Sequence, residues 1–234
     1  ATIALTIGRD ATSNWAIDPV PTAAFVVAVA SVMVTYTVGA AFGGDRTGVT
    51  LVLAGVAVVS FTSAVQTFLL QRNLEVFREV VRWITGSLAN SSWGDVRLVL
   101  PYVAVSVVVL LAHRRHLDVF RVGGDEAATL GMNVARTRLV IVIAATLGTA
   151  AVVSVSGLIG FVGLVVPHIV RLIAGAGHRR LLPLSLMGGA AFLILADIPG
   201  RMLSNPAETP IGVVTAFIGA PFFIYLLRTK RVGA

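Results

Sequence analysis

Apolar runs of about 18 residues recur along this chain, and they restrict its fold more than any other feature. A helix of that length crosses the roughly 30 Å hydrocarbon core of a bilayer. The chain is 56% hydrophobic and only 12% charged, whereas soluble domains carry about 25% charged residues. A soluble domain could not bury so many apolar segments. The pattern therefore predicts an all-α fold, a polytopic transmembrane helical bundle.

The predicted spans are separated by polar connections. Residues 1–8 are already apolar and are interpreted as the tail of one span. Further spans are predicted at 22–42, 48–70, 96–112, 139–156, 159–174, 181–198 and 211–227. Length alone would allow 139–174 to be one kinked helix. The glycines there and Pro167 favour two helices, the second of them short.

Basic residues gather between the spans, and their distribution predicts the orientation of the chain. The clusters are Arg114, Arg115 and Arg121; Arg136 and Arg138; Arg179 and Arg180; and Arg228, Lys230 and Arg231. Placing them in the cytoplasm together with Arg46 gives a consistent alternation of spans. The connections 9–21, 71–95 and 199–210 then face outward. The net charge of +7 is explained by topology, so nucleic acid is not an expected partner.

The outward connection 71–95 contains a predicted amphipathic helix. Leu74, Phe77, Val81 and Ile84 recur at helical spacing, with Glu75, Arg78, Glu79 and Arg82 between them. A helix with one apolar and one charged face is typical of the membrane interface. By its residues alone, this helix would cap the bundle.

The sequence carries no recognisable catalytic motif. It contains no HExxH, GxSxG or P-loop pattern, and the adjacent Asp125 and Glu126 would point to different sides of a helix. The absence of cysteine excludes thiolate chemistry. His113 and His116 are three residues apart, but their basic surroundings disfavour a cation and favour anchoring at the interface. We expect no metal site, no cofactor and no enzymatic activity in this chain.

Ionisable residues inside predicted spans are candidates for function. His168 and Arg171 lie near the cytoplasmic end of their span, where Arg171 can snorkel to the interface. Asp197 lies near an outer end, four residues before Arg201, which is the favourable order for a helical ion pair. Pro199 between them predicts an earlier end of this helix, which would break the pairing.

Residues 123–138, GGDEAATLGMNVARTR, form the most informative polar connection. Asp125 is a suitable N-cap residue, and Glu126 would lie in the first turn. Gly131 suits the stop position of a helix, and Asn133 can cap the next helix. The segment therefore predicts two short helices joined by a tight bend at the cytoplasmic face.

The stretch 156–171, SGLIGFVGLVVPHIVR, is mostly apolar, with glycine at every third position near its start. Small residues at this spacing allow helix backbones to approach closely in a membrane. The stretch resembles the signature of the FecCD-type permeases. The residues that carry this resemblance are Gly157, Gly160, Phe161, Gly163, Pro167, His168 and Arg171. LGMNVARTR, ADIPGR, NPAETPIG and GAPFFIYLLR also resemble family motifs, in the family's order.

The resemblance covers the whole chain and implies a single permease domain over 1–234. Family members are longer, so we expect the chain to be incomplete, with roughly two N-terminal spans missing. The family implies a permease subunit of a type II ABC importer for ferric siderophores, haem or vitamin B12 in the bacterial inner membrane. Its implied partners are cytoplasmic ATP-binding subunits, an outer substrate-binding protein, a second permease copy or paralogue, and membrane lipid. Ferric siderophore is the favoured cargo because it is the commonest in the family; haem and cobalamin stay open.

The resemblance also implies roles for individual residues. The coupling helices that dock on the ATP-binding subunit would lie in 123–138, with Asp125, Glu126, Leu130, Gly131, Asn133 and Arg136 as coupling residues. Arg201 would receive a glutamate of the binding protein; the alternative is a local pair with Asp197 and nothing more. The helix in 71–95 would re-enter the membrane at the outer mouth of the path, as the alternative to an interfacial cap.

The predicted helix 48–70 is the candidate wall of the translocation path. Its polar residues are Thr50, Ser60, Ser63 and Gln66. Alternatively, their side chains bond to the backbone of the preceding turn inside a packed helix.

Two other classes of membrane protein compete with the importer. An ion-coupled secondary transporter, with Asp197 or His168 as a proton relay, would need a carboxylate near the bilayer midplane, and Asp197 lies near a span end. A purely structural membrane subunit gives no reason for the ordered polar bend in 123–138.

Overall fold

The computed structural model describes residues 19–41, 48–72, 80–81, 83–89, 91–121, 123–129, 131–202 and 209–231, and every structural statement below concerns these residues. Within them the chain is helical. The helices are α2 (Pro19–Ala41), α3 (Gly48–Arg72), α5 (Trp93–Ala112), α6 (Arg114–Val119), α7 (Gly124–Thr129), α8 (Val134–Ser156), α9 (Val162–Ala174), α10 (His178–Met202) and α11 (Ile211–Arg231). The all-α prediction is confirmed for this part of the chain.

Each predicted span that falls within the described residues is a helix. α3, α5, α8 and α10 are long and apolar enough to cross a membrane, and α2, α9 and α11 contain shorter apolar stretches. The predicted tail span at 1–8 and most of the predicted amphipathic helix in 71–95 lie outside the described residues. Of that amphipathic helix, residues 80–81 and 83–85 are described, and they are helical. The described part of the chain is therefore a multi-pass bundle.

Helix α5 begins at Trp93, three residues before the predicted span, because a capping box precedes it. The Ser92 hydroxyl accepts a hydrogen bond from the Asp95 backbone N–H at 3.3 Å, and the Asp95 carboxylate accepts one from the Ser92 N–H at 2.8 Å. The two bonds satisfy backbone donors that a helix start leaves without partners.

The chain breaks between α8 and α9, as predicted, and α9 is short at 13 residues. The break lies between Gly157 and Phe161, which have φ angles of 70° and 66°. Pro167 does not cause it, because this proline lies inside α9. The expected early end of α10 at Pro199 is wrong, since α10 continues to Met202. Apolar spans tolerate an internal proline where neighbouring groups satisfy the freed carbonyl.

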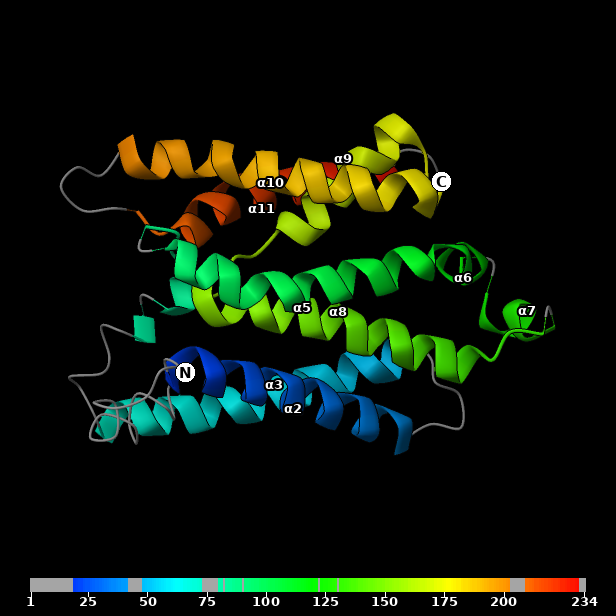
Figure 1. Cartoon of the computed structure of the whole chain (residues 1–234), viewed down its shortest axis with the longest axis horizontal. Coiled ribbons are helices and arrows are strands. Elements are labelled where there is room, and N and C mark those ends of the chain that lie inside the picture. The colour runs from blue at the N-terminus through cyan, green and yellow to red at the C-terminus, as the bar shows by residue number, and fades with distance from the viewer. Residues whose placement is uncertain are drawn as a thin grey trace.

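The helices form two groups. In the first group α2 packs on α3 and α8, and α5 packs along α8; in the second group α10 packs on α9 and α11. Figure 1 shows the second group above α5 and α8, with α2 and α3 below them. The helices α6 and α7 lie at one end of the molecule, which we call the α7 end. The opposite end is called the junction end.

Helix α8 is the centre of the first group. It carries the buried residues Ala144, Ala150, Ala151, Ser154 and Ser156. The Ser106 hydroxyl of α5 donates a hydrogen bond to the Ala144 carbonyl at 2.7 Å, and Gly148 leaves room for this hydroxyl. Small residues let the two backbones approach, so packing and an interhelical hydrogen bond hold α5 to α8.

Three chain segments meet by backbone contact at the junction end. The Trp83 carbonyl accepts hydrogen bonds from the N–H groups of Gly86, at 3.3 Å, and Leu158, at 3.2 Å. The Ser87 N–H donates to the Ser156 carbonyl at 2.9 Å. These bonds tie residues 83–87 to the end of α8. We call residues 83–87, residues 156–158 and Gly212 together the backbone junction.

Glycine is required where the segments of the backbone junction touch. A Cβ added to Gly157 would overlap the Trp83 carbonyl oxygen, and one added to Gly212 would overlap that of Thr85. The sequence predicts a close backbone approach at Gly157, Gly160 and Gly163. Of these three glycines, only Gly157 has another described chain segment in close contact. An added Cβ at Gly160 or Gly163 meets no described atom within 4 Å.

Replacing either contact glycine should therefore destabilise the protein. We expect Gly157→Ala and Gly212→Ala each to cost about 1–3 kcal/mol, because backbone cannot move aside as a flexible side chain can. The measurement is the thermal unfolding midpoint of the purified protein in detergent. Gly163→Ala is the control, and its midpoint should be unchanged or higher. Equal midpoints for all three variants would contradict the importance of the backbone junction.

Candidate functional site

The connection between α6 and α8 holds the helix α7, which begins at Gly124. The Ala127 N–H donates to the Gly123 carbonyl at 3.1 Å, so the helix starts earlier than predicted. Asp125 and Glu126 therefore both lie in the first turn, and the expectation that Asp125 is the N-cap is wrong. Acidic residues in a first turn are still favoured by the helix dipole.

Gly131 ends α7 in a Schellman motif. The Gly131 N–H donates to the Ala128 carbonyl at 2.9 Å, and the Met132 N–H donates to the Ala127 carbonyl at 3.3 Å. Gly131 has a φ angle of 78°, a backbone conformation that is costly for residues with a Cβ. The predicted stop at Gly131 is confirmed. Leu130, which the resemblance also assigns to coupling, lies outside the described residues.

Asn133 caps the following helix, as predicted. Its side-chain oxygen accepts a hydrogen bond from the Arg136 backbone N–H at 3.0 Å. The capped helix is not a second short helix, however, because it continues without a break as α8 through Ser156. Only residues 130–133 separate α7 from this long helix. Hydrogen bonds therefore close the chain on both sides of the bend.

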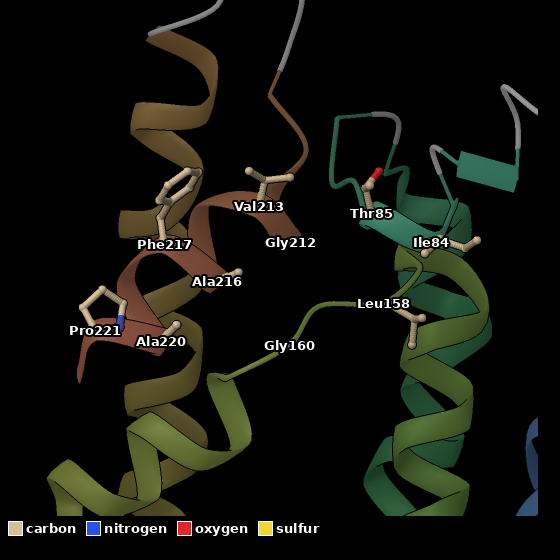
Figure 2. Close-up of a pocket in the computed structure, with 10 residues that line it drawn as sticks. All are labelled: Ile84, Thr85, Leu158, Gly160, Gly212, Val213, Ala216, Phe217, Ala220 and Pro221. Carbon is tan, nitrogen blue, oxygen red and sulfur yellow. The ribbon is translucent and has the colours of Figure 1, made fainter. Parts of the chain in front are cut away.

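A cavity of about 630 Å³ opens beside α11. Figure 2 shows Ile84, Thr85 and Leu158 on one side and α11 on the other, with the link that carries Gly160 between them. The α11 residues that line the cavity are Gly212, Val213, Ala216, Phe217, Ala220 and Pro221. The lining is almost wholly apolar, and the cavity shares Ile84, Thr85, Leu158 and Gly212 with the backbone junction.

The predicted path residues on α3 do not line this cavity. Ser60 and Ser63 are exposed on α3, and Thr50 and Gln66 are half-buried. Backbone bonding of hydroxyls, the alternative considered for these residues, is present at other positions of the helix. The Thr67 hydroxyl donates to the Ser63 carbonyl at 2.9 Å. The sequence does not predict the cavity on α11, because its lining consists of ordinary apolar residues, glycine and a single threonine.

The signature residues of 156–171 serve different purposes. Phe161 adopts a left-handed conformation and lies so close to Gly219 of α11 that an added Cβ there would overlap its ring. The His168 ring packs edge-on against Phe222 of α11, with the ring centroids 6.1 Å apart. Arg171 is exposed, near the end of α9. Phe161 and His168 thus attach α9 to α11.

Arg201 and Asp197 form an ion pair near the end of α10. The Arg201 Nε donates to the Asp197 carboxylate at 2.6 Å, and the Arg201 side chain is 52% exposed. The helical pairing is therefore present, and the expectation that Pro199 breaks it is wrong. Exposed pairs at this spacing contribute about 0.3–0.5 kcal/mol. The pair leaves much of the guanidinium accessible to another acidic group.

The sequence matches the model of the FecCD transport family over residues 1–229. The chain belongs to this family. It spans 57% of the length of a cobalamin import system permease from Halobacterium salinarum, to which it is 44% identical over 91% of this chain. It is also 38% identical to a Fe(3+)-citrate import system permease of Bacillus subtilis, over 89% of this chain and 62% of that protein. A hemin transport system permease of Yersinia pestis is 36% identical, over 77% of this chain and 54% of that protein.

A solved structure has the same fold. It is an inward-facing conformation of a metal-chelate-type ABC transporter, which superposes with a TM-score of 0.86 at 28% identity. The match covers 97% of this chain and 71% of that chain. The resemblance inferred from the motifs is therefore confirmed, both for the family and for the helical membrane fold.

The turn at Gly131 yields a test of the bend. Gly131→Ala should destabilise the Schellman motif by about 1 kcal/mol. The equilibrium constant for opening of the turn then rises about fivefold, and amide exchange becomes faster by the same factor. Hydrogen exchange at the amides of residues 131 and 132 measures this opening. Gly177→Ala is the control, because an added Cβ there meets no described atom and no positive φ is needed. Unchanged exchange in Gly131→Ala would contradict the motif.

Proposed function

We propose that this chain is the membrane-spanning part of a permease subunit in a type II ABC importer of the bacterial inner membrane. The observation that carries the proposal is the connection between α7 and α8. A short helix with a closed end is joined by residues 130–133 to a membrane-length helix. This arrangement is suited to transmit a displacement of α7 to α8. The permease itself is not catalytic, and a partner subunit hydrolyses ATP.

The proposed partners bind at opposite ends of the bundle. The α7 end carries the basic residues Arg114, Arg115, Arg136 and Arg138, which favours a cytoplasmic location by the positive-inside rule. The ATP-binding subunit would dock there, with Asp125, Glu126, Leu130, Gly131, Asn133 and Arg136 in or beside the contact. The substrate-binding protein would dock at the opposite end, where the exposed Arg201 would receive an acidic side chain.

The proposed path lies between two copies of the permease. α11 carries Phe217, which is 75% exposed, and Tyr225, which is 67% exposed. Together with the exposed face of α3 that carries Ser60 and Ser63, these side chains would face a second copy or the path. The cavity beside α11 would open toward that path. A lining that is mostly apolar suits a large chelate that must pass without tight binding.

The proposed cargo is a metal chelate, with ferric siderophore favoured over haem and cobalamin. The relatives are named for cobalamin, iron(3+) citrate and hemin, and the solved relative for a metal chelate. The competing secondary transporter is less well supported, since Asp197 already pairs with Arg201 near a helix end. Binding assays of the partner binding protein with ferric siderophore, hemin and cobalamin would decide among the cargoes.

The coupling role of α7 is tested by Gly131→Val. We expect this variant to insert and dimerise normally, while association with the ATP-binding subunit, or uptake per ATP hydrolysed, falls. Pull-down of that subunit and parallel ATPase and uptake assays in proteoliposomes measure both. Gly175→Val is a matched control, because Gly175 also has a positive φ, at 83°, and open space around it, but it ends α9. Normal coupling in Gly131→Val, or equal loss in both variants, would overturn the assignment.

The docking role of Arg201 is tested by charge reversal. Arg201→Glu should slow association with the binding protein, most strongly at low salt, because a rim charge acts mainly on the association rate. The equilibrium effect should be small, about 1 kcal/mol or less. Asp197→Asn is the control, since it removes the local pair and keeps the positive charge. If Asp197→Asn and Arg201→Glu lower stability equally and leave association unchanged, Arg201 serves the local pair alone.

A further inference from the structure

Asp118 of α6 binds the first residue of α10, which lies 60 positions later in the chain. Its carboxylate oxygen Oδ1 accepts a hydrogen bond from the His178 backbone N–H at 3.0 Å and lies 2.6 Å from Nδ1 of the His178 ring. His178 is buried, whereas the Asp118 side chain is 40% exposed. One carboxylate thus caps the start of a 25-residue helix from outside that helix.

The hydrogen bonds between Asp118 and His178 determine which of the two side chains carries the shared proton. Hydrogen bonds from the His178 backbone N–H and then from its ring hold the pKa of Asp118 below its usual value of 3.8. The carboxylate is therefore ionised at neutral pH, and its stabilising effect is lost only as the pH falls through the lowered value. An ionised carboxylate has no proton to donate, so His178 Nδ1 carries the proton of the shared bond. The negative charge also faces the positive end of the α10 dipole.

A second hydrogen bond strengthens the same contact. The Arg121 guanidinium donates to the Ala176 carbonyl at 3.0 Å, just before α10 begins. Together with the two hydrogen bonds of Asp118, this bond holds the end of α6 and the residue Arg121 after it against the start of α10. The two helices also pack together. We call Asp118, Arg121, Ala176 and His178 the α6–α10 clasp.

The clasp joins the two helix groups at the α7 end. α6 follows α5 of the first group after the single residue His113, whose backbone continues hydrogen bonding from Val109 to Leu117. α10 belongs to the second group. At the junction end the same groups are joined by the backbone junction. Figure 1 shows α6 between the end of α5 and the start of α10, with α7 just beyond.

We propose that Asp118 is a positioning residue that makes the second helix group follow α7. The proposal rests on the proposed function, because it concerns where the force from an ATP-binding subunit goes. Through residues 130–133, α7 displaces α8 of the first group. Because α5 packs along α8 and continues into α6, the displacement reaches α6, and the clasp transmits it to α10. Helix α10 extends along the molecule to Asp197 and Arg201. Without the clasp, a displacement of α8 would not be accompanied by an equal displacement of α10.

The test begins with a distance measurement in the permease alone. The chain has no cysteine, so spin labels can be attached at Ala135 of α8 and at Ile173 of α9, which is 82% exposed. Labelled chains are diluted with unlabelled ones to remove distances between copies. Asp118→Ala should broaden or shift the distance distribution between the two groups. Asp118→Asn should preserve it, because the amide oxygen can accept the same two hydrogen bonds.

Asp95→Ala is the matched control for lost capping. Asp95 also accepts a hydrogen bond from a backbone N–H at a helix start, but it joins no second helix group. Its distance distribution should match that of the unsubstituted chain. If Asp118→Ala does not fold, His178→Phe keeps a buried ring and the backbone bond and removes only the ring's hydrogen bond. It should broaden the distribution less.

The second measurement is uptake per ATP hydrolysed in proteoliposomes with the partner subunits. Asp118→Ala should lower this ratio severalfold, whereas Asp118→Asn and Asp95→Ala should retain it. An unchanged distance distribution, or an unchanged ratio despite a broadened distribution, would overturn the positioning role. If the unsubstituted chain supports neither ATPase association nor uptake, the proposed function fails instead. The distance measurement still reports on the clasp in that case.

Discussion

A single carbonyl oxygen, that of Trp83, organises the junction end of this bundle. It accepts hydrogen bonds from Gly86 and from Leu158, and Gly157 approaches it so closely that no Cβ fits between them. In a bilayer no water is present to satisfy a broken helix, so every free backbone group must find a partner in the protein. The break between α8 and α9 can exist because residues 83–87 supply those partners. The cavity beside α11 lies against the same break.

The two helix groups therefore have two connections of different chemistry. At the junction end the connection is backbone against backbone, which tolerates little displacement because close packing leaves no room. At the α7 end it consists of side-chain hydrogen bonds around Asp118, which lies partly in solvent. Polar contacts at an aqueous surface rearrange more readily than closely packed backbone contacts. The connection at the α7 end is thus expected to open first when the two groups are pulled apart.

The sequence was sufficient to predict the helices and the family, because long apolar runs and local caps act over a few residues. Asn133 and Gly131 occupy their predicted roles for this reason. Pro199 was misjudged, since a rule from isolated helices does not include neighbours that satisfy a freed carbonyl. The Ser92–Asp95 capping box is also a local pattern, and it places the start of α5 before the apolar run. The Asp118–His178 contact and the α11 cavity join residues that are distant in sequence, so no local sequence pattern predicts them.

The order in which the backbone junction is joined has a consequence for biosynthesis. Residues 83–87 precede Ser156 and Leu158 in the chain, and both precede Gly212. As the ribosome releases the chain from its N-terminal side, each later segment meets a partner that has already been made. The carbonyl groups at the end of α8 therefore find their hydrogen-bond donors as soon as they enter the bilayer. Of the three segments of the junction, α11 is synthesised last and packs on the two that are already joined. Membrane insertion and assembly can therefore proceed in one direction along the chain.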